Sequence, residues 1–404
     1  MALQPFAGRA AIVGVGWTPF SRASGVTVGD LATACVLDAL DDAGLAVHDV
    51  DGLLSYAMND SIPVLGLARS LGLTRLRWHQ DLFGGGTQTA SILGDAAMIV
   101  DAGLADVVVI YRALNGRSGK RMGQTAVGHA EDAHFYGQYG LAGPVQLYAL
   151  AAQRYLHATG QTDDDLAAVA VELRAHAVRN PRALMRTPLT VDDHHASPFV
   201  ATPLRRFDCC QETDGGCALV VTSIDRARDL PHPPVAIRSV VRGGGPGCSA
   251  LDRAEDIDGV FTRYLADELW RTSGLTPADV DVALLYDAYT WVVLAQLEDL
   301  GFCPPGEAGA FVRAGGLRLD GALPTNTNGG LLSEGYVHGL NNVAEAVVQL
   351  RHEAGDRQVP DAEVALCTGF GGSFGTAAIL TRDTGDTGGA GGVGGVGGAE
   401  GVAR

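Results

Sequence analysis

The chain is dominated by one pattern, an alternation of short apolar runs with segments whose apolar residues recur at helical spacing, and this alternation occurs twice. In the first half, the runs at 10–16, 52–56 and 105–111 predict strands, and 27–44 and 88–104 predict helices. The run Ala-Asp-Val-Val-Val-Ile-Tyr at 105–111 is typical of a strand buried on both faces.

The same order returns after about residue 234. Strands are expected at 235–241, 282–286, 364–367 and 376–380, and helices at 257–273, 291–300 and 341–353. Two halves of this kind predict an α/β protein built by duplication. We therefore expect a first half at 1–233, with a less periodic loop domain inserted at about 115–232, a second half at 234–383, and a flexible glycine-rich tail at 384–404.

The charge balance limits the classes of ligand. The chain has 29 basic and 46 acidic residues, a net charge of −17, which argues against a general nucleic-acid binder or a protein of anionic membrane surfaces. A phosphate-bearing ligand would need a local basic patch. The best candidate is the glycine-containing loop after the strand 105–111, which carries Arg117, Lys120 and Arg121. The alternative is an ordinary solvated loop.

The cysteines and termini predict a cytoplasmic protein without metal. The seven cysteines form no Cys-x-x-Cys pair, so neither a disulfide framework nor a structural zinc site is expected. The N-terminus lacks the layout of a secretion signal, and no uninterrupted apolar run is long enough for a membrane span. The segment Asp192-Asp193-His194-His195 offers metal-ligating side chains, but a solvated loop is the better interpretation because adjacent residues rarely face one ion.

The segment Gly371-Gly372-Ser373-Phe374-Gly375 matches the pattern of a serine-hydrolase nucleophile elbow. That elbow precedes a helix and needs a later histidine. Here the next segment predicts a strand, and the last histidine is His352. We therefore predict a glycine-rich turn whose backbone N–H groups, that of Gly371 among them, could hold an oxyanion.

Three other segments stand where predicted strands pass into loops, the places where backbone donors and helix N-termini converge. They are Tyr286-Asp287-Ala288-Tyr289, the pair Asn326–Gly330 with Gly335–Gly339, and Cys367–Gly371. Asp287 is expected to orient its loop by accepting backbone hydrogen bonds. Taken alone, a tyrosine at such a junction is more often a packing residue, and a histidine there is as often structural as functional.

These segments resemble the thiolase superfamily, and specifically its sterol-carrier-protein and lipid-transfer-protein types, up to about residue 382. The resemblance includes the ordered motif elements Asn180-Pro181, Pro188–Val191, Pro203–Cys210, Asp214-Gly215 and Asn328-Gly329-Gly330. It implies two βαβαβαββ halves packed as a five-layer α/β/α/β/α sandwich. It also implies a homodimer.

The chain departs from a working thiolase at the catalytic positions. The position of the family's nucleophilic cysteine is occupied here by Phe83 or Gly84, and neither residue can form a thioester. The histidine of the Gly-His-Pro motif corresponds to Tyr336, and the first residue of another motif corresponds to Tyr286. The cysteine of the last motif is retained as Cys367.

This combination is similar to that of the aldolases that degrade steroid side chains. The resemblance implies retro-aldol cleavage of a steroid-derived β-hydroxyacyl-CoA to a ketosteroid and a short acyl-CoA, such as propionyl-CoA, with coenzyme A present only as part of the substrate. It implies Tyr286 and Tyr336 as base and acid, in either order, supported by His338, Cys367, Gly371 and Asp287.

The same resemblance implies a partner subunit with an OB-fold (DUF35-type) domain that binds acyl-CoA, in an assembly of two chains of each kind. Two alternatives stay open. One is a non-catalytic acyl-CoA-binding subunit. The other is a true acetyl-CoA acyltransferase that uses Cys367, which the missing loading cysteine makes the weaker of the two.

Overall fold

The computed structural model describes residues 3–121, 133–141, 143–246 and 258–383. Its strands are β1 Ala10–Trp17, β2 Gly52–Ala57, β3 Trp78–Phe83, β4 Val107–Asn115, β5 Phe199–Ala201, β6 Leu204–Arg205, β7 Asp214–Ser223, β8 Val235–Gly244, β9 Val282–Leu284, β10 Val364–Phe370 and β11 Phe374–Arg382.

The helices of the first half and of the insertion are α1 Val28–Asp42, α2 Val64–Leu71, α3 Ser91–Asp101, α4 Ala133–Gly137, α5 Pro144–Thr159, α6 Asp163–Val178, α7 Val191–Ala196 and α8 Ile224–Ala227. Those of the second half are α9 Thr262–Ser273, α10 Thr290–Asp299, α11 Ala308–Arg313, α12 Gly330–Ser333 and α13 Leu340–Leu350. None of these helices combines the length and apolarity needed to cross a bilayer.

The main strands form one mixed sheet in the order β3-β2-β4-β7-β1-β8-β11-β10-β9. The centre of the sheet lies between β1 and β8, and the strands on either side of it follow one another in the same arrangement. In the first half, β1 pairs antiparallel with β7, β7 pairs antiparallel with β4, and β4 pairs parallel with β2. In the second half, β8 pairs antiparallel with β11, β11 pairs antiparallel with β10, and β10 pairs parallel with β9. At the place in the second half that corresponds to β3, Thr325 forms a parallel bridge with Ala283 of β9. The internal duplication is therefore present.

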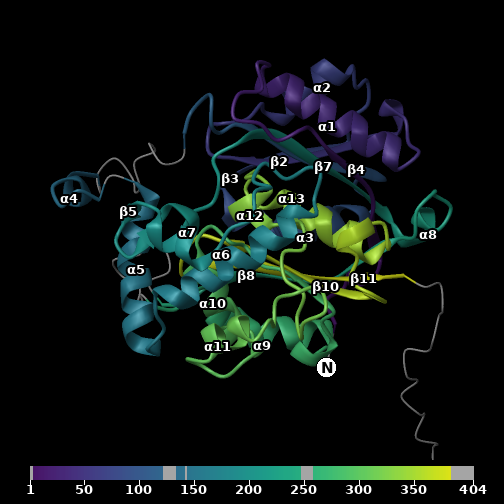
Figure 1. Ribbon diagram of the computed structural model, residues 1–404. Coiled ribbons are helices and arrows are strands. Elements are labelled where there is room, and N and C mark those ends of the chain that lie inside the picture. The colour runs from purple at the N-terminus through teal and green to yellow at the C-terminus, as the bar shows by residue number, and fades with distance from the viewer. Residues whose placement is uncertain (1–2, 122–132, 142, 247–257, 384–404) are drawn as a thin grey trace, which may run out of the picture.

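The strands β1 and β8 join the two halves of the sheet through the residue pairs Ala11 with Ala236 and Ile12 with Val235. Figure 1 shows how the halves separate into layers: α1 and α2 cover the first half, α3 and α13 lie between the halves, and α9 to α11 cover the second. Three clusters of buried apolar side chains fill the three spaces. The predicted five-layer α/β sandwich is confirmed.

The structure corrects the limits of the predicted insertion at 115–232. Residues 214–223 form β7, a fully packed strand in the middle of the sheet, and α8 follows it. The segment outside the layers is therefore shorter at its C-terminal end, and it carries α5, α6 and α7. The strand β3 and the helix α2 also lie in segments for which no element was predicted. The tail at 384–404 lies outside the described residues.

Glycine is required where α1 crosses β1. A Cβ at Gly16 would lie 2.3 Å from the backbone nitrogen of Ala39 and from the carbonyl of Cys35. A Cβ at Gly14 would lie 2.2 Å from the carbonyl of Ala39. Because the obstructing atoms belong to the helix backbone, a side chain at either position would push α1 away from the sheet.

We predict that Gly16→Ala lowers the free energy of unfolding by about 1–3 kcal/mol, the usual cost of overpacking a core. Urea unfolding measures the change. Gly137→Ala is the matched control, because a Cβ at Gly137 would have no neighbour within 4 Å. Equal stability of the Gly16→Ala variant and the wild-type chain would contradict the close packing of α1 on β1.

Candidate active site

Two predicted site residues, Tyr286 and Tyr336, meet in the structure. Tyr286 follows β9, and Tyr336 lies in the loop between α12 and α13. Their hydroxyl oxygens are 2.9 Å apart, so one hydroxyl donates a hydrogen bond to the other. Burial raises the pKa of both phenols well above the usual value for tyrosine. Both hydroxyls are therefore neutral at physiological pH, and the pair can pass a proton from one ring to the other.

Side-chain hydrogen bonds hold the backbone of each tyrosine. The Tyr286 N–H donates to the hydroxyl of Thr368 at 2.7 Å, and the Tyr336 N–H donates to the hydroxyl of Thr213 at 2.7 Å. The amide of Gln296 links the first pair by donating to the Tyr286 carbonyl and accepting from Thr368. These bonds fix the backbone at each tyrosine and so help to orient the two rings toward each other.

His338 stacks edge-on against Tyr336, with 4.9 Å between the ring centres. Its Nδ1 accepts from Nε and Nη2 of Arg112, at 3.0 and 2.7 Å. Arg112 is fully buried on β4, and its Nη2 also donates to Asp60 at 2.7 Å. Because Nδ1 is the acceptor, the hydrogen of the neutral ring lies on Nε2.

The neutral form of His338 is strongly favoured. Burial and the Arg112 charge lower the pKa of His338 to about 3. The Nε2 atom is buried and has no hydrogen-bond partner in the described part of the chain. His338 therefore presents an unused N–H donor beside Tyr336, which is the arrangement expected of a group that holds a substrate oxygen.

The loop after β3 makes room for the tyrosines. A Cβ at Gly86 would lie 2.4 Å from the Tyr286 hydroxyl, and one at Gly85 would lie 3.1 Å from the His338 ring. These two glycines, rather than Phe83 or Gly84, face the site, and the side chain of Phe83 is 73% exposed. The conclusion drawn from the sequence is unchanged, because neither glycine can act as a nucleophile.

The four supporting residues named from the sequence lie in different places. His338 adjoins the pair. Asp287 accepts from the N–H groups of Leu331 and Leu332, as expected of a residue that orients its loop, and burial raises the pKa of Asp287 to about 6. Cys367 is fully buried in the core between the two halves of the sheet, and burial raises the pKa of its thiol.

Gly371 is not the oxyanion donor that the sequence indicated. Its N–H donates to the carbonyl of Phe374 at 2.9 Å and closes the hairpin between β10 and β11. The segment at 371–375 is thus a turn between two strands, as predicted, but this N–H is already used.

A cavity of about 370 Å³ reaches Tyr336 from the surface of the insertion. Its wall includes Arg22, Arg117, Arg121 and Arg206, together with Cys209, Cys210 and Tyr289. Arg121 pairs with Glu212. Within the described residues, the other three arginines form no ion pair. The cavity therefore has a positive wall in a chain whose net charge is −17, and it suits an anionic group.

The structure revises the predicted basic patch. Arg117 and Arg121 line the cavity, whereas Lys120 is exposed and is not one of the lining residues. Sequence reasoning did not select Arg22, Arg206 or Arg112. Arg206 lies within the motif segment Pro203–Cys210, which could have identified it; Arg112 follows an apolar run on a buried strand and carries no comparable signal.

The segment Asp192–His195, expected to be a solvated loop, lies in the helix α7. Thr190 caps it by accepting from the N–H of Asp193 at 3.1 Å. His194 is fully buried, whereas the Asp192 and Asp193 side chains point to solvent. The expectation of a solvated segment is therefore wrong for His194.

The chain matches known proteins over most of its length. The family model "Thiolase C-terminal domain-like" matches residues 249–382. A 17-hydroxy-3-oxo-4-pregnene-20-carboxyl-CoA lyase from Mycobacterium tuberculosis is 45% identical over 85% of this chain and 92% of the relative. A steroid side-chain-cleaving aldolase from Thermomonospora curvata is 43% identical over 85% of this chain and 90% of its own length.

A solved structure described as an Ltp2-ChsH2(DUF35) aldolase superimposes with a TM-score of 0.88, at 41% identity, over 94% of this chain and all of the matched chain. The duplicated sheet and these matches define the class of protein. The chain belongs to the thiolase superfamily and, within it, to the thiolase-like family of the steroid side-chain-cleaving aldolases.

The low pKa of His338 predicts how stability responds to acid. The unfolded histidine, with a pKa near 6.5, takes up a proton as the pH falls from 7 to 5, whereas the folded one does not. This difference lowers the free energy of unfolding by about 2 kcal/mol over that interval. Urea unfolding at the two pH values should show a correspondingly smaller loss in His338→Gln. Equal losses in both proteins would contradict a neutral, buried His338.

Proposed function

We propose that the chain is a carbon–carbon lyase that cleaves a steroid-derived β-hydroxyacyl-CoA by a retro-aldol reaction. The observation that carries the proposal is the hydrogen-bonded Tyr286–Tyr336 pair beside the unused Nε2–H of His338. The names of the relatives support it, since one is a 17-hydroxy-3-oxo-4-pregnene-20-carboxyl-CoA lyase and another a steroid side-chain-cleaving aldolase. In the CoA ester after which the first relative is named, the 17-hydroxyl group stands on the carbon β to the thioester carbonyl.

The reaction needs a base on the β-hydroxyl and an acid at the α-carbon. Tyr286 accepts the hydroxyl proton while its own proton passes to Tyr336, and Tyr336 protonates the α-carbon; the two roles are interchangeable. The Cα–Cβ bond breaks and leaves a 17-ketosteroid and, for this side chain, propionyl-CoA. A relay of this kind never requires a free tyrosinate, which agrees with the raised pKa of both phenols.

As the bond breaks, its electrons shift toward the thioester oxygen, which carries enolate-like negative charge until Tyr336 delivers its proton to the α-carbon. In this scheme the Nε2–H of His338 donates to that oxygen, and the contact of Arg112 with Nδ1, which keeps the hydrogen on Nε2, supports this role. No cysteine acyl-enzyme forms in this scheme. Catalysis uses coenzyme A only as part of the substrate and draws on no separate cofactor.

The arginine-lined cavity holds the phosphates of coenzyme A. Arg22, Arg117 and Arg206 are the main contacts, and Arg121 contributes beside Glu212. An anion that enters a wall of guanidinium groups gains charge-assisted hydrogen bonds, and Arg is suited to phosphate geometry. Lys120 plays no direct part in this scheme.

The chain acts in the cytoplasm with a DUF35-type OB-fold subunit, in an assembly built on a homodimer. The composition of the solved Ltp2-ChsH2(DUF35) aldolase supports the partner. Co-expression with such a subunit should give a stable complex of two chains of each kind, measured by light scattering. Full activity of the chain alone would contradict a required partner.

The competing function is that of a non-catalytic acyl-CoA-binding subunit. Turnover of a 17-hydroxy steroid side-chain CoA ester distinguishes the two functions. We predict release of a 17-ketone and a short acyl-CoA in equal amounts by the chain with its partner subunit. Tyr286→Phe and Tyr336→Phe should each lower kcat by roughly 10²–10⁴ through loss of proton transfer. Tyr111→Phe, which removes a buried hydroxyl from the outer layer, is the matched control.

Cys367→Ala should keep most of the activity, because the thiol lies in the apolar core and takes no part in the scheme. Loss of turnover in Cys367→Ala together with active Tyr→Phe variants would overturn the aldolase proposal in favour of a thiol mechanism. No turnover by any protein would favour the binding subunit.

The cavity makes a separate prediction about binding. Arg22→Gln and Arg117→Gln should raise the KM for the CoA ester several-fold with little change in kcat, because phosphate contacts lie away from the reacting carbons. Arg271→Gln, on the exposed face of α9, is the control. Unchanged KM values in both variants would show that the phosphates bind elsewhere.

A further inference from the structure

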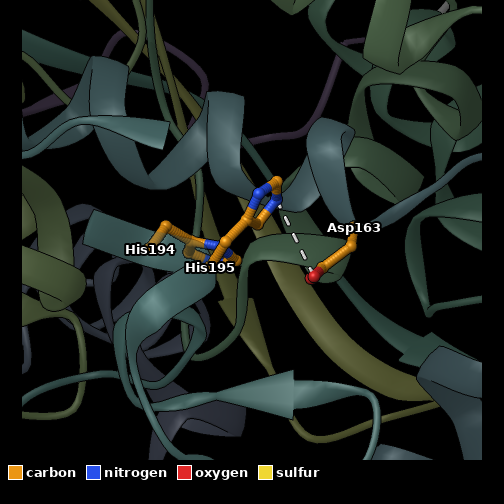
Figure 2. Close-up of side chains that lie close together, drawn as sticks. All are labelled: Asp163, His194 and His195. Atoms are coloured by element: carbon orange, nitrogen blue, oxygen red, sulfur yellow. Dashed lines mark ion pairs between the residues drawn. The ribbon is translucent and has the colours of Figure 1, made fainter. Parts of the chain in front are cut away.

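Three side chains that can bind a metal ion converge between α6 and α7. Asp163 is the first residue of α6, and His194 and His195 lie on α7. Each offers one ligand atom, and the three atoms lie within 4.8 Å of one another. Figure 2 shows His195 extended toward Asp163, with His194 beside it. The cluster belongs to none of the groups assigned to catalysis.

His194 is held as a metal-ligating histidine usually is. Its Nε2 is 2.8 Å from Oδ1 of Asp208, and that carboxylate also accepts from the hydroxyl of Thr290 and the N–H of Arg205. The carboxylate keeps the histidine hydrogen on Nε2 and leaves the Nδ1 lone pair available. A second-shell carboxylate of this kind fixes the orientation of metal-bound imidazoles.

The Nδ1 atom of His194 lacks a partner although the side chain is fully buried. It forms no hydrogen bond with any described residue. Buried acceptors in folded proteins are nearly always satisfied by protein, water or an ion. The orphaned lone pair is the observation, independent of the convergence itself, that indicates a bound group here.

The other two side chains have ligand atoms to spare. Oδ2 of Asp163 accepts from Nε of Arg205 at 3.0 Å, and its Oδ1 has no hydrogen-bond partner in the described structure. Among the described residues, the Nε2 of His195 has no hydrogen-bond partner, and it lies 3.3 Å from the exposed Asp164 carboxylate. The side chains of Asp163 and His195 are 38% and 35% exposed, so both can move without disturbing the core.

We propose that Asp163, His194 and His195 form a site for a divalent transition-metal ion, and that zinc fits it best. Two imidazoles and a carboxylate are ligands that zinc prefers. Tetrahedral zinc with bonds of about 2.0 Å needs ligand atoms about 3.3 Å apart. Small movements of the two partly exposed side chains, Asp163 and His195, would bring the three ligand atoms to that spacing. A water molecule or Asp164 supplies the fourth ligand.

The location gives the site a structural role. Asp208, which holds His194, is followed directly by Cys209 and Cys210 on the cavity wall, and Arg206 precedes it. A metal ion would tie α6 and α7 to this wall segment. The site is therefore expected to stabilise the insertion and to act independently of the proposed reaction.

Zinc binding to the untagged, metal-stripped chain tests the proposal, measured by competition with a chromophoric chelator. We expect one equivalent to bind, and His195→Gln and Asp163→Asn to weaken the affinity at least tenfold. His79→Gln, an exposed histidine on β3, is the control and should bind as the wild type does.

Thermal unfolding provides a second readout, because an ion that binds only the folded chain raises Tm. Zinc should raise the Tm of the wild-type chain and of His79→Gln, but not that of His195→Gln. His195 is partly exposed, so this variant should fold and keep the comparison valid. Absence of zinc binding, or equal affinity and equal Tm shifts in all variants, would overturn the proposal.

Discussion

The buried contact between Arg112 and His338 is the interaction on which the rest of the site depends. Arg112 comes from β4 of the first half and His338 from the loop before α13 of the second, so the contact joins the two halves. The His338 carbonyl also accepts from the hydroxyls of Tyr56 and Thr89 of the first half. A buried guanidinium is costly unless it is paired, and Asp60 supplies the compensating charge. The result is a neutral histidine held in one tautomer at the junction of the halves.

The chemistry follows from what fills the space above this junction. A glycine at position 86 leaves room for the Tyr286 ring, and a side chain there would collide with its hydroxyl. In the proposed scheme, the proton-transfer pair therefore depends on the space that this glycine leaves free. The same duplicated fold carries both this arrangement and the covalent site of a working thiolase, because the sheet positions the loops and the loops alone determine the reaction.

Apolar runs and helical spacings predicted the duplicated α/β pattern, because both are strong signals. The five-layer packing was implied by the resemblance to the thiolase superfamily, and both tyrosines were selected because they stand on motif positions of that family. The sequence did not predict β7, whose Asp-Gly-Gly start lowers the strand signal, or the burial of His194 in α7. Arg112 could not be found, because its role depends on Asp60 and His338, which only the fold brings together. The N–H of Gly371 was misjudged because its partner, the Phe374 carbonyl, depends on the hairpin geometry.

The central claim is that the tyrosine pair moves a proton to the α-carbon of a CoA enolate, with no acyl-enzyme. Turnover of a 17-hydroxy steroid side-chain CoA ester in D₂O tests this most directly, with mass spectrometry of both the short acyl-CoA and the intact protein. The account predicts one deuterium at the α-carbon of the released acyl-CoA and no added mass on the protein. An acyl adduct on Cys367, with an acyl-CoA product free of deuterium, would contradict it.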